Sequence, residues 1–225
     1  MVNRIVFCDI EGTLVEGSLS SGFVRAGRAM HLFSPGRMLQ AQFYMLLMRL
    51  LPRYAPRLRW EALLRLLAGH SAADIQRAGR AGLQDLQRQL KPNVMARLTA
   101  HQEQGDTVIL LSGGPQDAAT VVAEEVGAAA GEGTRPEQRN GVYTGRIGSG
   151  INHGPAKARR AATLAAARGV ALADCVAYGD SAADIPLLAS VGHPVAVDPD
   201  PALRAAAQAR GWEILVSSGR PAPAP

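Results

Sequence analysis

The 225-residue sequence contains little cysteine, few aromatic residues and no long uninterrupted apolar stretch. Its two cysteines, Cys8 and Cys175, cannot build a disulfide framework, so we expect a reducing compartment and a cytoplasmic protein. The longest apolar stretch, 38–51, is 14 residues long and includes two glutamines and an arginine. Because a membrane-spanning helix needs about 20 apolar residues, we expect no stable insertion into a membrane.

Lysine is also rare, since only Lys91 and Lys157 are lysines among the 24 basic residues. The formal net charge of +5 is compatible with nucleic acid or with a small anionic molecule as the partner. Aromatic residues make up only 4% of the chain, and the basic residues form no run. We therefore expect no nucleic acid and favour a small anionic molecule. Asp9 and Glu11 interrupt the N-terminal region too early for the apolar centre of a signal peptide.

Short aliphatic runs that end abruptly at a polar residue are the main pattern in most of the chain. They lie at residues 5–8, 107–111, 175–178, 194–197 and 213–216. Continuous rather than alternating hydrophobicity is typical of parallel strands that are covered on both faces. Alanine-rich helical stretches lie at 92–104, 117–127, 154–168, 182–190 and 201–210. This alternation predicts an α/β fold with a Rossmann-like parallel sheet, and Asn140-Gly141 predicts a small hairpin.

Residues 16–89 lack this alternation and have a helical pattern that prolines interrupt. We therefore predict an all-helical domain at 16–89, inserted into an α/β core that is formed by 1–15 and 90–216. The proline-rich tail at 217–225 is expected to be disordered. Within the helical domain, we expect the apolar stretch 38–51 to form the core. The alternative is an apolar lid that meets a lipid-like leaving group or a membrane surface.

The polar residues that follow the aliphatic runs form a chemically coherent set. They are Asp9, Glu11, Ser112, Asp180 and Asp184, and Lys157 joins them at the start of a helix. Ligands bind beyond the carboxyl ends of parallel strands, so these side chains should converge. Converging carboxylates need a hard cation, and oxygen-only ligands favour Mg²⁺. The lysine and the Ser-Gly-Gly turn add anion ligands, and the whole set indicates phosphoryl transfer through an aspartyl-phosphate.

Four motifs occur in the order that is found in the haloacid dehalogenase (HAD) superfamily. They are Asp9-Ile10-Glu11-Gly12-Thr13, Ser112-Gly113-Gly114, Lys157 and Gly179-Asp180-Ser181-Ala182-Ala183-Asp184. The chain resembles the phosphoserine-phosphatase-like branch, in which a helical cap is inserted directly after the first motif. The likeness covers the whole chain except the tail. It implies a Mg²⁺-dependent phosphatase that acts on a small phosphorylated metabolite through an aspartyl-phosphate intermediate.

The resemblance also implies a role for each carboxylate. Asp9 is expected to be the nucleophile, and Glu11 is expected to be the general acid and base. The Asp9 carboxylate and the Glu11 backbone carbonyl should bind Mg²⁺ together with Asp180, and Asp184 should lie in the ligand set or directly behind it.

The phosphoryl oxygens are expected to be held by the Ser112 hydroxyl, the Gly113 N–H and the Lys157 ammonium. Lys91 occupies no position in the four motifs, so we expect its replacement by methionine to be nearly silent.

Two positions depart from the family pattern. The usual second carboxylate of the first motif is Asp, whereas Glu11 is one methylene longer, and a displaced catalytic acid can lose substantial rate. This leaves a phosphotransferase, or a retired member that only binds a phosphorylated ligand, as alternatives. Phosphoserine phosphatases also carry a Glu nine residues after the nucleophile, where this chain has Ser18. We therefore expect that phosphoserine itself is not the substrate.

Overall fold

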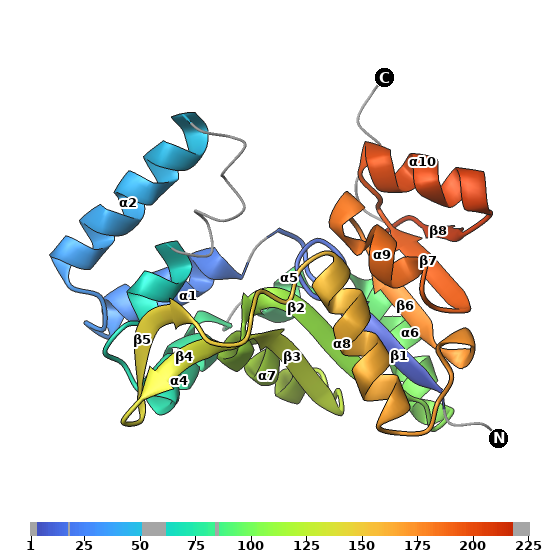
Figure 1. Cartoon of the computed structure of the whole chain (residues 1–225), viewed down its shortest axis with the longest axis horizontal. Coiled ribbons are helices and arrows are strands. Elements are labelled where there is room, and N and C mark those ends of the chain that lie inside the picture. The colour runs from blue at the N-terminus through green and yellow to red at the C-terminus, as the bar shows by residue number, and fades with distance from the viewer. Residues whose placement is uncertain (1–3, 18, 51–61, 84–85, 218–225) are drawn as a thin grey trace.

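A six-stranded parallel sheet forms the centre of the molecule, and the computed structural model describes residues 4–17, 19–50, 62–83 and 86–217. In spatial order (Figure 1) the strands are β3 (Ala130–Thr134), β2 (Thr107–Pro115), β1 (Ile5–Asp9), β6 (Val176–Gly179), β7 (His193–Val197) and β8 (Glu213–Leu215). The central strand β1 is buried throughout and pairs in parallel with β2 and β6. The carboxyl ends of these three strands therefore meet at one edge of the sheet.

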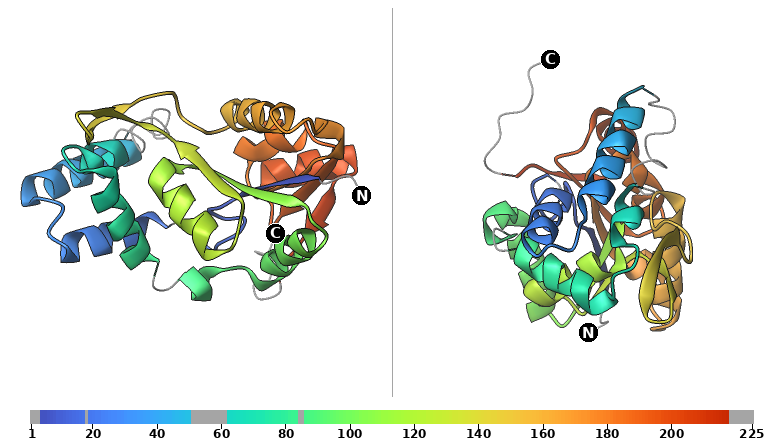
Figure 2. Two further views of the ribbon diagram at one scale, coloured as in Figure 1. Left: turned by 90° about the horizontal axis from the view of Figure 1, so that it is seen from below. Right: turned by 90° about the vertical axis from the view of Figure 1, so that its left-hand side faces the viewer.

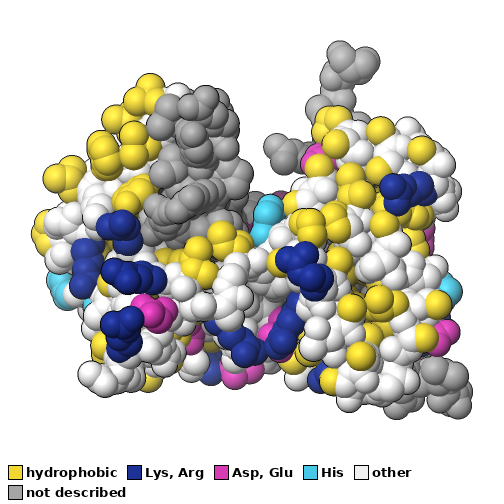
Figure 3. Space-filling view, viewed as in Figure 1, with side chains coloured by type: hydrophobic (Ala, Val, Ile, Leu, Met, Phe, Trp, Pro, Cys, Tyr) yellow, Lys and Arg dark blue, Asp and Glu magenta, His cyan; other side chains and the backbone are white. Residues whose placement is uncertain are grey.

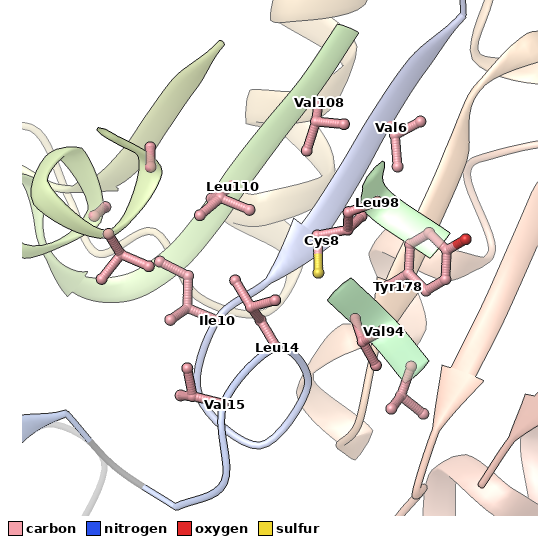
Figure 4. Packing of buried hydrophobic residues seen from close by; sticks show 14 of the residues in the cluster. Val6, Cys8, Ile10, Leu14, Val15, Val94, Leu98, Val108, Leu110 and Tyr178 are labelled. Carbon is pink, nitrogen blue, oxygen red and sulfur yellow. The ribbon is translucent and has the colours of Figure 1, made fainter. Parts of the chain in front are cut away.

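Helices cover both faces of the sheet, as Figure 2 shows. They are α6 (Pro92–Glu103), α7 (Gln116–Glu125), α8 (Pro155–Ala166), α9 (Ile185–Leu188) and α10 (Pro201–Arg210). On one face Val6 and Cys8 of β1 belong to a buried cluster with residues of α6 and α7 (Figure 4). On the other face Phe7 belongs to a cluster with residues of α8, α9 and α10. Successive strand residues point to opposite faces of the sheet, so a strand that is covered on both faces must be apolar throughout. The predicted α/β fold class is confirmed.

Strand β3 is absent from the strands that the sequence predicts. Its residues, Ala130–Thr134, include two glycines and no aliphatic run. The glycines are required by packing, because a Cβ at Gly131 would clash with the Ala119 carbonyl and one at Gly133 would clash with the backbone at Gln116. Helix α7 therefore lies too close to β3 for larger side chains at these two positions. Without such side chains the strand has no apolar run by which the sequence could reveal it.

The segment after β1 is helical, with α1 (Ser20–Ala29), α2 (Pro35–Leu50), helical turns at 62–67, α4 (Ala72–Gly82) and α5 (Leu86–Gln89). Helices α1 and α4 approach each other closely, because a Cβ on Gly22 would lie 2.5 Å from the Gly82 carbonyl oxygen. Figure 1 shows that this helical part lies beside the sheet edge at which β1 and β2 end. An inserted helical cap on a parallel-sheet core is thus the observed architecture.

The predicted hairpin is present as β4 (Pro136–Arg139) and β5 (Val142–Ile147), which form a two-stranded antiparallel sheet. It is fastened to the helical part, since the Tyr143 N–H donates to the His70 carbonyl. The Tyr143 hydroxyl donates to Asp117 at the start of α7, at 2.6 Å, and Gln76 of α4 donates to the same carboxylate at 3.2 Å. One buried carboxylate therefore joins the hairpin, α4 and α7.

Helix α2 contradicts the expectation that 38–51 forms a core. Four large apolar side chains of this helix, at Leu39, Phe43, Leu46 and Leu50, are 52–68% exposed. In Figure 1 the helix projects away from the sheet, and these exposed side chains are not packed into the core of the described part of the chain. No helix in the described part of the chain has the length and apolar character needed to cross a membrane.

Two sequence-based expectations fall outside the described residues. They concern Ser18 and most of the tail, 218–225. Ser217, which we assigned to the disordered tail, is described and is buried against Asp198.

Candidate active site

Three carboxylates cluster at the carboxyl edge of the sheet. Asp9 ends β1, and Asp180 and Asp184 follow the neighbouring strand β6. One oxygen atom from each of the three carboxylates lies within 4.8 Å of the others. Asp9 is 6% exposed and Asp184 is fully buried, whereas Asp180 is partly open. The pairing of β1 with β6 brings these residues together from distant parts of the chain.

The buried ammonium of Lys157 lies between two of these carboxylates. It donates to Asp9 Oδ1 at 2.5 Å and to Asp184 Oδ1 at 2.8 Å. Burial alone lowers the pKa of a lysine, but here the charges of Asp9 and Asp184 outweigh burial and raise the pKa of Lys157 above its usual value. Lys157 is therefore a fixed positive charge beside Asp9.

The carboxylate cluster carries more negative charge than Lys157 can balance. Burial raises the pKa of Asp9, with Lys157 opposing this effect and Asp184 adding to it. Burial and the charge of Asp184 raise the pKa of Asp180 in the same way. Three carboxylates against one ammonium leave an anionic, oxygen-lined site, which suits a divalent cation such as Mg²⁺.

Thr13 links two members of the cluster, a contact that the sequence did not predict. Its hydroxyl lies 2.9 Å from Asp180 Oδ1 and 3.4 Å from Asp9 Oδ2. The loop reaches this position because Gly12 has a φ of +87°. A Cβ on Gly12 would also clash with the Asp180 carboxylate. The glycine of the first motif is therefore required both by backbone conformation and by the close approach of Asp180.

Glu11 lies apart from the three clustered carboxylates. Its Oε1 accepts a hydrogen bond of 3.0 Å from the Leu19 N–H, immediately before α1. An acceptor at this place satisfies one of the unpaired N–H groups at the start of a helix. Glu11 and Ser112 both line one pocket between the helical part and the core. The side chain is therefore placed at the junction with the cap, next to the carboxyl-terminal part of β2.

The last residues of β2, from Ser112 on, are held by hydrogen bonds. The Ser112 Oγ accepts from the Gly114 N–H at 2.8 Å. Thr134 donates to the Gly113 carbonyl at 2.7 Å, and Asn152 donates to the Ser112 carbonyl at 3.1 Å. Both supporting side chains are buried. The sequence did not reveal them, because Thr134 lies in the unpredicted strand β3 and Asn152 lies in a loop.

Lys91 is unsuitable as a silent control, which corrects the sequence-based expectation. It is 6% exposed, donates to the Gly12 carbonyl, and forms an ion pair of 2.8 Å with Asp198. Asp198 in turn accepts from the Ser217 N–H at 2.8 Å. Lys91 therefore supports the loop that carries the first motif, although it is 79 residues away from Gly12 in the sequence.

Comparisons with known proteins agree with this geometry. A family model described as haloacid dehalogenase-like hydrolase matches residues 6–189. A protein of Mycobacterium tuberculosis named as a phosphoserine phosphatase is 34% identical over 214 residues, which cover 92% of this chain and 69% of that protein.

Solved structures show the same fold. A Bordetella pertussis protein of unknown function has a TM-score of 0.81 and 28% identity, covering 96% of this chain and 99% of its own. A phosphoserine phosphatase in its apo form has a TM-score of 0.64 at 18% identity, covering 96% of this chain and 94% of its own. The family and fold predicted from the motifs are confirmed: this chain belongs to the haloacid dehalogenase-like hydrolases.

Proposed function

We propose that the chain is a Mg²⁺-dependent phosphatase that hydrolyses a small phosphomonoester through an aspartyl-phosphate on Asp9. The observation that carries this proposal is the position of Lys157, whose ammonium lies between the carboxylates of Asp9 and Asp184. A carboxylate repels an incoming phosphate dianion, and a fixed cation at this distance offsets that repulsion. The phosphatase names of the relatives support the same reaction class.

In the first step an Asp9 carboxylate oxygen attacks phosphorus, and the bond from phosphorus to the substrate alcohol breaks. The Glu11 carboxyl group gives its proton to the departing alcohol oxygen. Glu11 is suited to this role because the Leu19 N–H orients its side chain beside the pocket that it shares with Ser112. The Ser112 hydroxyl, the Gly113 N–H and Lys157 hold the phosphoryl oxygens.

In the second step a water molecule attacks the phosphorus of the aspartyl-phosphate. Glu11, now a carboxylate, takes the proton from this water, and the bond between phosphorus and Asp9 breaks to release inorganic phosphate. The division into a core of 1–15 and 90–216 and a cap of 16–89 belongs to the same proposal. Closing of the cap excludes water during the first step, and opening admits it for the second.

The metal would be held by the carboxylates of Asp9 and Asp180 and by the Glu11 backbone carbonyl, with Asp184 beside them. This assignment is supported by the chemistry of the clustered donors, which are all oxygen atoms. When bound, Mg²⁺ supplies charge neutralisation for the phosphoryl oxygens and the carboxylates.

The proposal is tested with p-nitrophenyl phosphate. Wild-type protein should hydrolyse it with Mg²⁺, lose activity in EDTA and regain activity on addition of Mg²⁺. Mg²⁺ should also raise the melting temperature of the wild type but not of Asp180→Asn. Asp9→Asn keeps the shape and removes the nucleophile, so activity should fall by several orders of magnitude. Full activity in excess EDTA, or a tenth of the rate in Asp9→Asn, would refute the scheme.

Product analysis separates hydrolysis from phosphotransfer. If an added acceptor alcohol receives most of the phosphoryl group, the chain is a phosphotransferase. If inorganic phosphate remains the main product, it is a hydrolase.

A further inference from the structure

The pocket next to Glu11 and Ser112 has apolar walls. They are formed by Phe23 of α1, Leu63 of the turns at 62–67, Ile75 of α4, Leu83 directly after α4, and Val121 of α7, among others. Among the described lining residues, Glu11 and Ser112 are the only ones with a polar or charged side chain. A substrate whose phosphate is held at Ser112 and Lys157 would place its alcohol part in this pocket.

A charged group on the alcohol part would find no charged partner other than Glu11 among the described residues that line this pocket. An ammonium or carboxylate group that is moved from water to apolar walls carries a large desolvation cost unless it is paired. The described lining residues include no basic side chain, and the carboxylate of Glu11 is assigned to proton transfer. We infer that the substrate is a phosphomonoester of an apolar alcohol, with an aliphatic or aromatic group bound between the cap and α7. This inference rests on the proposed function.

Gly79 is a second observation that points to the same ligand. It lies inside α4, where glycine is less favourable than alanine. A Cβ at this position would be 3.7 Å from the nearest atom, a methyl group of Val121, so a methyl side chain fits without strain. Packing therefore does not require glycine at this position. The space that Gly79 leaves open adjoins the pocket and is available to a ligand.

The experiment measures kcat/KM for unbranched alkyl phosphates from ethyl to hexyl, with O-phosphoserine for comparison. Each added methylene should raise kcat/KM roughly threefold until the pocket is filled, and phosphoserine should be a poorer substrate than propyl phosphate. Gly79→Ala should reduce the ratio of hexyl to ethyl phosphate by about threefold. The control Gly36→Ala, on exposed helix α2 with no neighbour within 4 Å, should leave the ratio unchanged.

Binding to Asp9→Asn distinguishes failure of the inference from failure of the proposed function. If no phosphomonoester is hydrolysed but the Kd of alkyl phosphates falls with chain length, the proposed function is refuted and the apolar pocket stands. If phosphomonoesters are hydrolysed but neither kcat/KM nor Kd depends on chain length, the inference is overturned and the proposed function stands. A preference for phosphoserine over propyl phosphate would also overturn it.

Helix α2 carries a separate apolar surface, and we call this surface the α2 stripe. It consists of Leu39, Phe43, Leu46 and Leu50, whose spacing of four, three and four residues places them on one face of the helix. All four are more than half exposed, and Figure 3 shows hydrophobic side chains gathered over α2. A contiguous exposed apolar patch of this kind marks an interaction site.

Charge and size indicate the kind of partner. Residues 16–89 contain 11 arginines and four acidic residues, whereas the rest of the chain has more acidic than basic residues. Helix α2 itself has no acidic residue. The stripe has only four side chains, whereas each partner contributes roughly 20–30 residues to a stable protein interface. We propose that the α2 stripe lies on an anionic lipid surface, where apolar insertion and basic charge act together.

Vesicle sedimentation tests this second proposal with the full chain. The protein should bind vesicles of phosphatidylcholine and phosphatidylglycerol, bind roughly tenfold more weakly in high salt, and not bind phosphatidylcholine alone. The double variant Leu39→Gln/Phe43→Ser should lose binding, with an unchanged circular dichroism spectrum. The control Val216→Ser, which alters an equally exposed apolar residue elsewhere, should bind normally. Absence of vesicle binding, or dimerisation at rising concentration that the double variant abolishes, would overturn the proposal.

Discussion

Replacement of Lys91 by methionine is the sharpest test of how the first motif is held in place. Methionine keeps the length of the side chain but removes both the ion pair with Asp198 and the hydrogen bond to the Gly12 carbonyl. The Lys91 side chain is 7% exposed and that of Asp198 is 28% exposed. The variant thus leaves a carboxylate largely buried without its cation.

The structure sets the magnitude of this effect. Removing one partner of a buried ion pair costs roughly 3–5 kcal/mol, and the partial exposure of Asp198 favours the lower end of this range. The loss of a donor to the Gly12 carbonyl adds about 1 kcal/mol. We therefore expect Lys91→Met to lower the free energy of unfolding by about 3–4 kcal/mol at pH 7. Activity should fall as well, because Lys91 no longer holds the Gly12 carbonyl, which lies between Glu11 and Thr13.

The effect should depend on pH. Burial raises the pKa of Asp198, but the hydrogen bonds from Lys91 and Ser217 outweigh burial and hold it below its usual value. A depressed carboxyl pKa contributes stability above the unfolded-state pKa of about 3.9. This contribution is lost as pH falls through the folded-state value. The difference in unfolding free energy between wild type and Lys91→Met should therefore shrink below about pH 4.

Urea denaturation followed by circular dichroism measures these differences. Arg80→Met is a matched control, because Arg80 forms an ion pair of 2.6 Å with Glu124 in which both side chains are about half exposed. Exposed pairs of this kind contribute at most about 1 kcal/mol. If Lys91→Met costs no more than Arg80→Met, or if its cost does not shrink in acid, Lys91 has no buried-pair role.

Three further predictions concern the site and the cap. Lys157→Met should lower kcat/KM by roughly 3 kcal/mol or more, on the scale of one lost preorganised donor, and an effect below tenfold would contradict its role beside Asp9. Glu11→Gln should impair cleavage of alkyl phosphates far more than transfer from an aryl phosphate, and a burst of aryl alcohol in rapid-mixing experiments should reveal the accumulated aspartyl-phosphate. An equal loss of rate with alkyl and aryl phosphates would show that Glu11 is not the general acid. Tyr143→Phe should destabilise the protein by about 1–3 kcal/mol, since the buried Asp117 loses a donor at 2.6 Å, and an unchanged urea midpoint would show that the hairpin is not fastened there.

Elements whose pattern is visible in their own residues could be predicted from the sequence. The buried run of β1 and the residues of α10, Pro201–Arg210, agree with the sequence pattern because continuous apolar runs and helical periodicity are local properties. Asp200 caps the start of α10, where its side chain accepts from the Leu203 N–H. Strand β3 escaped prediction because its glycines are explained only by the approach of α7.

The sequence by itself determined that Asp9, Asp180 and Asp184 would converge, because residues that follow adjacent parallel strands have few other places to lie. The tertiary structure alone decided what supports them. Lys91 reaches Asp198 across 107 residues of sequence, and no local pattern encodes the burial of either group. The same holds for the exposed face of α2, since periodicity identifies an apolar stripe but not whether another element packs against it. Burial is a property of the partners that a residue meets, and those partners are set by the chain topology.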